Sequence, residues 1–354
     1  MNHVIQVYAA EVSSSRHRGI FSSFFQLFLS IGLVLVYFMG SFDSFHYYDV
    51  SLVLIGILAM YECLVLLICE TPRWLLVHGH RSRAVSTLKL LRGQQCDIGA
   101  ELKSMEDDLS HSSCMKLSQV LNEFTKRDVI APLMVVVFVM FFNQSGGLNA
   151  RNAYSAEIFQ DANLHNPRAI AAYAVGGSGV FFTTISLLVV DRFGRKLLLL
   201  ISAIGMLIGT AMLGTYFYII QCDTNQNSST VSNSTLVDSN DACNGHLAPF
   251  AIVSIILFSA AYSIGWGPVA FVLMGELIPL QVRGIGSGIA TLVNWSTATV
   301  VVGFYLYYAE KVGAHFAWWT FSCFNLAAVI FVFVFVFETK GKTLEEIHDR
   351  SRKK

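Results

Sequence analysis

Eight apolar stretches constrain the fold of this chain more than any other feature of its sequence. About 20 residues of α-helix cross the roughly 30 Å hydrocarbon core of a bilayer, and each stretch is about that long. Backbone groups in lipid must bond internally, and runs without strand alternation favour helices over barrel strands. We therefore predict an all-α membrane protein with eight transmembrane helices. The stretches lie near residues 20–40, 50–69, 129–150, 169–190, 197–220, 248–275, 285–309 and 317–337.

The composition also favours a membrane protein. Hydrophobic residues make up 54% of the chain and charged residues 14%, so a water-soluble domain would need an unusually large core. The formal net charge is zero, whereas nucleic-acid binding requires a basic face. Membrane lipid is the expected surrounding, nucleic acid is not an expected ligand, and the sequence indicates no obligate protein partner.

A repeated frame indicates a duplicated architecture. A segment that begins with Glu and ends with Arg-Gly occurs at residues 11–19 and again, with the same spacing, at residues 276–284. Each copy is followed by two apolar stretches and then by a Glu-Thr pair, at residues 70–71 and 338–339. Shared spacing of this kind is typical of transporters built from internal repeats. The second copy closes a longer unit than the first, so we expect an N-terminally incomplete two-repeat protein.

The duplication predicts four regions along the chain. The second region carries apolar residues at helical spacing, Ala84, Leu88 and Leu91, before Gly93. The regions are residues 1–70, the last two helices of an N-terminal bundle; 71–128, a cytosolic helical linker; 129–338, a complete six-helix C-terminal bundle; and 339–354, a cytosolic tail.

The basic residues predict the orientation of the chain. All of the 24 Lys and Arg residues except Arg151, Arg168 and Lys311 fall on one side of the predicted helices. This side is cytoplasmic by the positive-inside rule. We expect a multi-pass protein of the plasma membrane or of an endosomal or lysosomal membrane.

The polar segment from residue 222 to residue 246 then faces the exterior or a lumen. It contains N-glycosylation sequons at Asn227 and Asn233, which could be modified only on that side. Cys222 and Cys243 flank the segment, so the sequence allows a disulfide there, and two unpaired thiols are the alternative.

Polar residues at the end of the third stretch give the strongest functional signal. Asn143, Gln144, Asn149 and Arg151 surround a Gly-Gly pair, and polar side chains in hydrocarbon need partners. Glycines loosen a helix, and broken helices near the midplane are where secondary transporters commonly bind substrate. The alternative is interhelical hydrogen bonding around a small-residue packing site.

Three more polar or amphipathic residues lie in other stretches, namely Gln26, Asn294 and Trp295. An amide both donates and accepts hydrogen bonds, which suits the hydroxyls of a polyol. An indole provides an apolar platform for the C–H face of a sugar. Together with the third stretch, these residues predict a neutral cavity lined by amides.

Five motifs stand in order along the chain. They are Glu70-Thr71-Pro72-Arg73, Gln144-Ser145-Gly146-Gly147-Leu148-Asn149, Asp191-Arg192-Phe193-Gly194-Arg195-Lys196, Gly265-Trp266-Gly267-Pro268 and Glu338-Thr339-Lys340-Gly341. These motifs resemble the signatures of the sugar porter family of the major facilitator superfamily, over essentially the whole chain. The likeness is greatest to class III facilitative glucose transporters, with insect-type trehalose porters close behind. It implies twelve helices in two bundles with the sugar between them, of which eight are present here.

The resemblance implies that Gln26, Gln144, Asn149, Asn294 and Trp295 contact the sugar. Elsewhere the chain departs from the family pattern. Asn143, Gly179 and Phe271 stand where the family has a Gln, an Asn and a Trp, respectively. The aromatic pair of the family is shortened to Ala153-Tyr154, and Arg151 places a cation where the family has an apolar residue. The departures leave room for an anionic ligand or a different polyol.

The resemblance also implies a cytosolic charge network that holds the two bundles together when the inside is closed. Exposed ion pairs contribute about 0.2 to 1 kcal/mol each, so several are needed to bias a two-state equilibrium. The positive-inside rule alone could explain the presence of any single Arg on the cytosolic side. It does not explain why acidic residues recur at a fixed spacing beside these arginines. The matching residues are Glu11, Arg18, Glu70, Arg73, Asp191, Arg192, Arg195, Glu276 and Arg283.

These features predict a passive carrier of a hexose or similar neutral sugar that works by alternating access. The sequence has no Walker motif, catalytic triad or metal cluster, so we expect no enzyme, cofactor or metal site. One alternative is a proton-coupled sugar, polyol or trehalose transporter, in which Glu62 carries the proton. Another is a truncated, non-transporting fragment with a sugar-binding or regulatory role.

Overall fold

Helices make up every regular element in the part of the chain that the structure describes. The computed structural model covers residues 8, 12, 18–40, 51, 53–57, 60, 69–93, 98–99, 102–103, 105–106, 124, 126–161, 166–230, 239–278 and 282–338 of the 354-residue chain. No strand occurs among these residues, so the prediction of an all-α protein is confirmed.

The helices follow one another in two groups, separated by a small helical pair. The first group is α2 (Arg18–Gly40), and the pair is α4 (Pro72–Val77) and α5 (Arg81–Arg92). The second group contains α8 (Arg127–Ser145), α9 (Leu148–Asp161), α10 (Pro167–Ala171), the π-helix η1 (Ala172–Gly177), α11 (Ser178–Phe193), α12 (Arg195–Thr230), α13 (Ser239–Ile264), α14 (Trp266–Leu277), α15 (Arg283–Lys311) and α16 (Ala314–Phe335).

Within the described residues, 6 helical stretches are long and apolar enough to cross a membrane. They confirm the six stretches predicted from residue 129 onward, and the shorter apolar helix Gln26–Gly40 lies at the first predicted stretch. The second predicted stretch, with Glu62, lies largely outside the described residues. The six are Val129–Gln160, Arg168–Val190, Arg195–Gln221, Pro249–Leu277, Arg283–Lys311 and Ala314–Phe335.

The first of these spans is longer than the sequence predicts. The prediction ended the span near residue 150, with Arg151 among the polar residues at that end. In the structure the span continues to Gln160, and Arg151 is buried inside it. A prediction from composition ends an apolar stretch at a charged residue. In the structure the helix continues, because neighbouring polar side chains accept hydrogen bonds from the guanidinium of Arg151.

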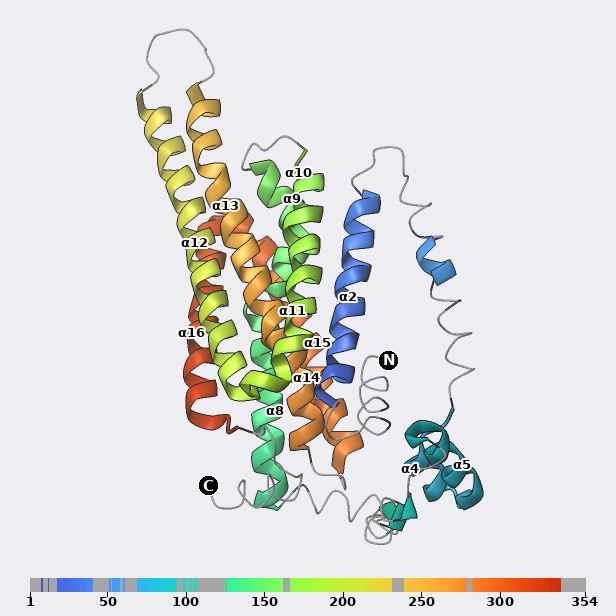
Figure 1. Cartoon of the computed structure of the whole chain (residues 1–354). Coiled ribbons are helices and arrows are strands. Elements are labelled where there is room, and N and C mark those ends of the chain that lie inside the picture. Colours follow the sequence, from blue (N-terminus) through green and yellow to red (C-terminus); the bar gives the residue numbers. More distant parts are fainter. Residues whose placement is uncertain are drawn as a thin grey trace.

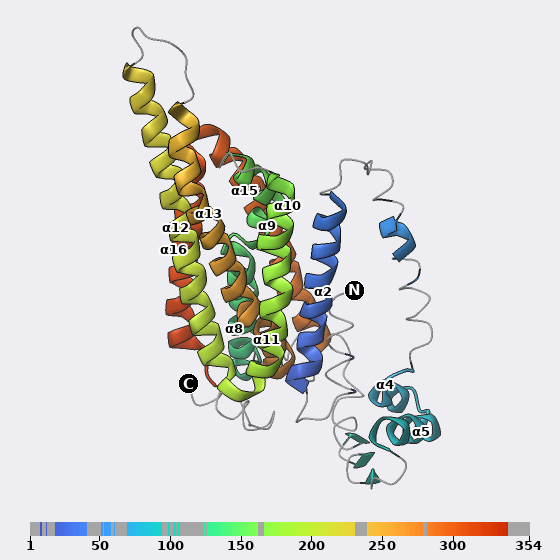
Figure 2. The ribbon, with the colours of Figure 1, turned by 45° about the horizontal axis from the view of Figure 1, so that its top comes forward.

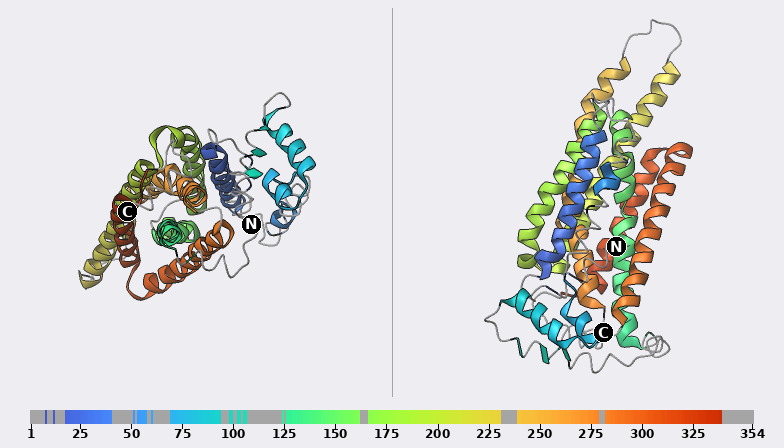
Figure 3. Two further views of the ribbon diagram at one scale, coloured as in Figure 1. Left: turned by 90° about the horizontal axis from the view of Figure 1, so that it is seen from below. Right: turned by 90° about the vertical axis from the view of Figure 1, so that its right-hand side faces the viewer.

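The second group forms one bundle around α8. Seen from one end, α8 lies inside a ring of the other helices (Figure 3, left), and its Val136, Val139 and Met140 are completely buried. Close packing between α12 and α13 depends on small residues, because a Cβ at Gly205 of α12 would stand only 2.7 Å from the Cβ of Ala261 on α13. The helix α2 stands along one flank of this bundle (Figure 1).

The span that contains α8 and α9 is broken at the predicted Gly-Gly pair. Gly147 has φ +92, a left-handed conformation that favours glycine, and a Cβ there would lie 2.7 Å from the ring of Phe321. Asn325 of α16 donates a hydrogen bond of 3.4 Å to the carbonyl of Gly146. The break is therefore held by α16 as well as permitted by glycine.

A π-helical turn, η1, occurs where α2 packs against the bundle. A Cβ at Gly176 would lie 2.9 Å from the side chain of Val34 on α2, so only glycine permits this approach. π-helical turns inside α-helices are frequent at functional sites. Here the turn brings the backbone around Gly176 to the edge of the cavity described below.

The described parts of the segment predicted as a polar loop, residues 222–230 and 239–246, are helical. The helix α12 continues to Thr230 and α13 begins at Ser239, so the two form a hairpin that projects beyond the other helices (Figures 1 and 2). Extending a nucleated helix costs little, so polar residues can continue a transmembrane helix into water. The side chains of Cys222, Asn227 and Cys243 and all of Asn233 lie outside the described residues, so glycosylation and the disulfide stay predictions.

The pair α4 and α5 lies apart from the bundle, near the end where α8 begins (Figure 1). Thr71 caps α4 by accepting a hydrogen bond of 3.2 Å from the backbone N–H of Trp74. Ala84 and Leu88 are buried, and α5 ends at Gly93 with φ 96, both as the sequence predicts. The division of the chain into four regions itself stays a prediction.

Candidate functional site

A cavity opens between α2 and the bundle, at the level of the break between α8 and α9. It offers about 110 Å³ of space to water-sized groups and continues into open solvent. All seven residues predicted to contact substrate line it. The complete lining is Gln26, Leu29, Ser30, Leu33, Asn143, Gln144, Leu148, Asn149, Arg151, Asn152, Val175, Gly176, Gly179, Tyr262, Ser263, Phe271, Asn294 and Trp295.

Three amides from two sides of the cavity form one hydrogen-bonded chain. Asn149 donates to the side-chain oxygen of Gln144 at 2.7 Å, and Gln144 donates to the side-chain oxygen of Asn294 at 3.0 Å. Asn294 in turn donates to the carbonyl of Met140 at 3.1 Å. The amide of Gln144 therefore uses one donor and one acceptor, and an amide has two of each, so capacity remains for a sugar hydroxyl.

Two other predicted residues fix the walls of the cavity. Asn143 is fully buried and donates to the backbone carbonyl of Trp266 at 3.0 Å, which links α8 to the start of α14. Gln26 of α2 is buried against Gly267, where a Cβ would stand 3.2 Å from the Gln26 amide. Trp295 also lies at the cavity, and it is 52% exposed.

Among the described residues that line the cavity, Arg151 is the one that carries a charge. Only 4% of its surface is exposed. Its Nε and Nη2 donate to the side-chain oxygen of Asn152 at 3.2 and 2.7 Å, and Nη1 donates to Ser259 on α13 at 2.5 Å. The guanidinium carbon lies 5.0 Å from the ring centre of Phe258. All of these partners are neutral.

The structure also shows polar contacts next to the cavity that sequence reasoning missed. The hydroxyl of Tyr37 on α2 donates to the backbone carbonyl of Asn152 and accepts a hydrogen bond of 3.1 Å from Ser155. Ser30 of α2 lies 3.3 Å from Thr183 of α11, hydroxyl to hydroxyl. The sequence does show these polar side chains inside apolar stretches. It does not show which stretches face each other, so the contacts could not be predicted.

A buried ion pair lies at the opposite end of α12 from the projecting hairpin. Arg195 and Glu276 are both largely buried and stand 3.4 Å apart, Nη2 to Oε1. Glu338 accepts hydrogen bonds from the backbone N–H groups of Arg195 and Lys196 at 2.9 and 3.2 Å, and it thereby caps α12. The sequence marked Glu338 as part of a motif, but not as a member of the charge network.

The other predicted members of the network differ in their exposure. Arg283 donates to the carbonyl of Gly275 at 3.0 Å. Glu70 and Arg192 are exposed, and Arg73 is half-buried. Glu11 and the side chains of Arg18 and Asp191 lie outside the described residues.

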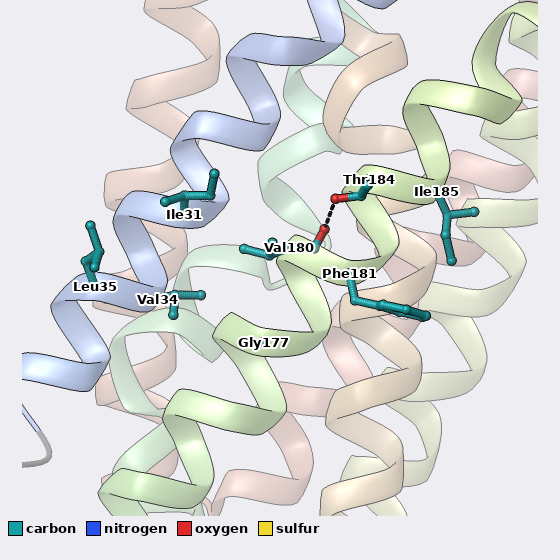
Figure 4. A pocket seen from close by; sticks show the side chains of 8 residues that line it. All are labelled: Ile31, Val34, Leu35, Gly177, Val180, Phe181, Thr184 and Ile185. Carbon is teal, nitrogen blue, oxygen red and sulfur yellow. Dashed lines mark hydrogen bonds between the residues drawn. The ribbon is translucent and has the colours of Figure 1, made fainter.

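A second groove, between α2 and α11, has a different character (Figure 4). It is lined almost entirely by aliphatic and aromatic side chains, among them Ile31, Val34 and Phe181. Its one hydroxyl, on Thr184, donates to the carbonyl of Val180 at 2.8 Å. The groove offers a sugar no free polar group, so the candidate site is the amide-lined cavity.

The spans, the broken helix and a polar cavity between helices define a multi-pass membrane protein of the major facilitator type. The model of the family "Sugar (and other) transporter" matches residues 1–350, and the chain belongs to this family. The described residues contain no cluster of His, Cys, Asp or Glu that could hold a metal ion.

Similar proteins agree with this assignment. The chain is 32% identical to the facilitated trehalose transporter Tret1 of Culex quinquefasciatus over 349 residues, which cover 97% of this chain and 62% of that protein. It is 31% identical to Tret1 of Drosophila erecta, covering 97% and 38%. A solved structure of the proton:xylose symporter XylE bound to 6-bromo-6-deoxy-D-glucose is 26% identical, with a TM-score of 0.76, covering 98% of this chain and 70% of XylE.

The chain spans less than two thirds of the length of the trehalose transporters that it resembles. The family and fold are thus shown, and they confirm the predicted sugar porter. The greater likeness to class III glucose transporters stays a prediction.

Proposed function

We propose that this chain takes part in the facilitative transport of a sugar across a membrane by alternating access. The observation that carries the proposal is the chain of amides formed by Asn149, Gln144 and Asn294, which keeps hydrogen-bonding capacity at the wall of a cavity between helices. A hexose or a similar sugar presents several hydroxyls in a ring, and amides can both donate to them and accept from them. Membership of a family of sugar transporters supports the same reading.

The arrangement of the helices suggests how the cavity would open and close. The helix α2 approaches the bundle through small residues, at Gly176 and Gly267, where rigid bodies can slide without large side chains interlocking. The break at Gly147 lets α9 change its angle to α8. The buried pair of Arg195 and Glu276 and the cap by Glu338 would hold the cytosolic end of the bundle as one body.

Two other functions have support of their own. The similarity to a proton:xylose symporter favours proton coupling, for which Glu62 is the proposed proton carrier. The similarity to trehalose transporters favours a disaccharide. A non-transporting sugar-binding fragment is the remaining alternative, and no obligate protein partner is proposed in any of these cases.

The test measures uptake and binding on the same protein. The chain is reconstituted into lipid vesicles, and uptake of radiolabelled glucose, xylose and trehalose is followed at external pH 5 to 8. Saturable uptake that does not depend on pH supports the facilitative carrier. Uptake that rises as the external pH falls, and loses this dependence in Glu62→Gln, supports proton coupling. Binding without uptake supports the non-transporting fragment, and absence of both contradicts the proposal.

A further inference from the structure

The charge of Arg151 is not balanced by any acid in the described part of the chain. Each of its three hydrogen bonds goes to a neutral side-chain oxygen, on Asn152 or on Ser259, and its ring contact is with Phe258. It is nonetheless 96% buried, within a membrane span. A buried charge is costly unless it is paired, and charged residues within spans usually serve substrates or ions.

The guanidinium also has donors to spare. Arginine carries five N–H groups, and the three hydrogen bonds use one on each nitrogen. One N–H on each terminal nitrogen therefore remains, so the guanidinium keeps a fork of two donors for a carboxylate. Asn152 and Ser259 hold the guanidinium from two helices, so the fork is positioned before any ligand arrives.

Arg151 shares the cavity with the amides that are proposed to hold sugar hydroxyls. It lies two residues after Asn149 on α9, and both residues line the same cavity as Gln144 and Asn294. A ligand that fills the cavity would therefore meet hydroxyl-binding groups in one part and a cation in another. No second basic residue stands among the described residues that line the cavity, so this lining provides for one negative charge.

We propose that Arg151 makes the cavity selective for a sugar acid, a monosaccharide that bears one carboxylate, such as a hexuronate. This inference rests on the proposed function and names the substrate class of the same site. The hydroxyls of the sugar ring bind the amides around Gln144, and the carboxylate accepts two hydrogen bonds from Arg151. A phosphorylated sugar fits less well, because its second negative charge would be buried without a partner.

The alternative role for Arg151 is structural, as a tie between α9 and α13 through Ser259. The two roles predict different results for selectivity. Loss of a tie lowers binding of all sugars together, whereas loss of the carboxylate fork lowers binding of the sugar acid and leaves that of the neutral sugar.

The experiment compares binding of radiolabelled glucuronate, glucose and glucose 6-phosphate to the chain in lipid vesicles. In the wild type we expect glucuronate to bind roughly 10- to 100-fold more tightly than glucose, which is the usual worth of hydrogen bonds to a charged group. In Arg151→Gln this preference should disappear. In Arg151→Lys, which keeps the charge without the fork, it should be intermediate. Arg168→Gln, a change of an exposed arginine on α10, serves as the matched control.

Four results would overturn the proposal. Glucose binding without a preference for glucuronate overturns the assignment to a sugar acid but leaves the proposed function intact. A preference for glucuronate that survives in Arg151→Gln does the same. Tighter binding of glucose 6-phosphate than of glucuronate overturns the assignment to one charge. A chain that binds none of the three compounds overturns the proposed function, and this proposal with it. Thermal unfolding of each variant shows whether a loss of binding reflects a loss of folding.

Discussion

The side-chain amide of Gln144 on α8 donates a hydrogen bond of 3.0 Å to the side-chain oxygen of Asn294 on α15. These residues are far apart in the sequence, and both are buried. The bond joins the centre of the bundle to one of the helices around it. It therefore serves both the packing of the helices and the polar wall of the cavity.

Replacing Asn294 with alanine should destabilise the chain. The change removes the acceptor of Gln144 and the donor to Met140, and buried polar groups without partners cost about 1 to 3 kcal/mol. We expect the thermal unfolding midpoint in detergent to fall by several degrees. Ser296→Ala, an exposed change two residues along the same helix, is the control. Equal midpoints for Asn294→Ala and wild type would show that the bond contributes nothing to stability.

Gly194→Ala should disturb the cap at the start of α12. Gly194 has φ +88, and a Cβ there would stand 2.6 Å from the carboxylate of Glu338, which caps the N–H groups of Arg195 and Lys196. A left-handed backbone alone costs an alanine roughly 1 kcal/mol or more. The thermal midpoint of unfolding should fall, while Gly288→Ala, with open space around its Cα, should leave it unchanged or raise it. A stable Gly194→Ala variant would mean that Glu338 does not cap α12.

The pair of Arg195 and Glu276 should behave as one unit in a double-mutant cycle. Both side chains are largely buried, so Glu276→Leu alone leaves a buried charge, which costs roughly 3 to 5 kcal/mol. Arg195→Met with Glu276→Leu removes both charges and should cost much less. The free energies of unfolding in denaturant give the coupling. Single effects that add up to the effect of the double variant would rule out a direct interaction.

Cys222 and Cys243 should form a disulfide. Contacts between α12 and α13 pair Gly205 with Ala261 and Gly209 with Phe258, in an antiparallel register. Continued along both helices, this register brings positions 222 and 243 opposite each other, on the side predicted to face an oxidising compartment.

The disulfide can be tested by alkylating the denatured chain without reduction. The free thiols of Cys69 and Cys323 should react, and Cys222 and Cys243 should react only after a reductant has been added. Cys222→Ser should then make Cys243 reactive at once. If both cysteines react before reduction, no bond joins them.

Much of the fold can be predicted from the sequence, because lipid imposes a simple rule on it. A span must be long, apolar and helical, so residues 129–338 show the spans directly. The break at Gly146-Gly147 is also readable, because two glycines stand next to several amides. The motifs that contain Arg195 and Glu276 predicted a network of paired charges, and the structure places these two side chains together.

Other features depend on which helices face each other, and a single sequence does not give this. The partners of Arg151 are one example: Ser259 and Phe258 lie on α13, more than a hundred residues away. Tyr37 and its contact with α9 are another. The helical hairpin beyond Cys222 was missed for a different reason, since polar composition resembles that of a loop.

The central claim is that the amide-lined cavity binds the sugar, and equilibrium binding to a Gln144→Ala variant tests it most directly. Removing this amide breaks the hydrogen-bonded chain between Asn149 and Asn294 at its middle. Binding of radiolabelled glucose and glucuronate to the reconstituted chain is compared with that of wild type and Ser296→Ala. We predict that the affinity of Gln144→Ala for both sugars falls roughly 10-fold or more, with no change in Ser296→Ala. Saturable binding with unaltered affinity in Gln144→Ala would contradict the account.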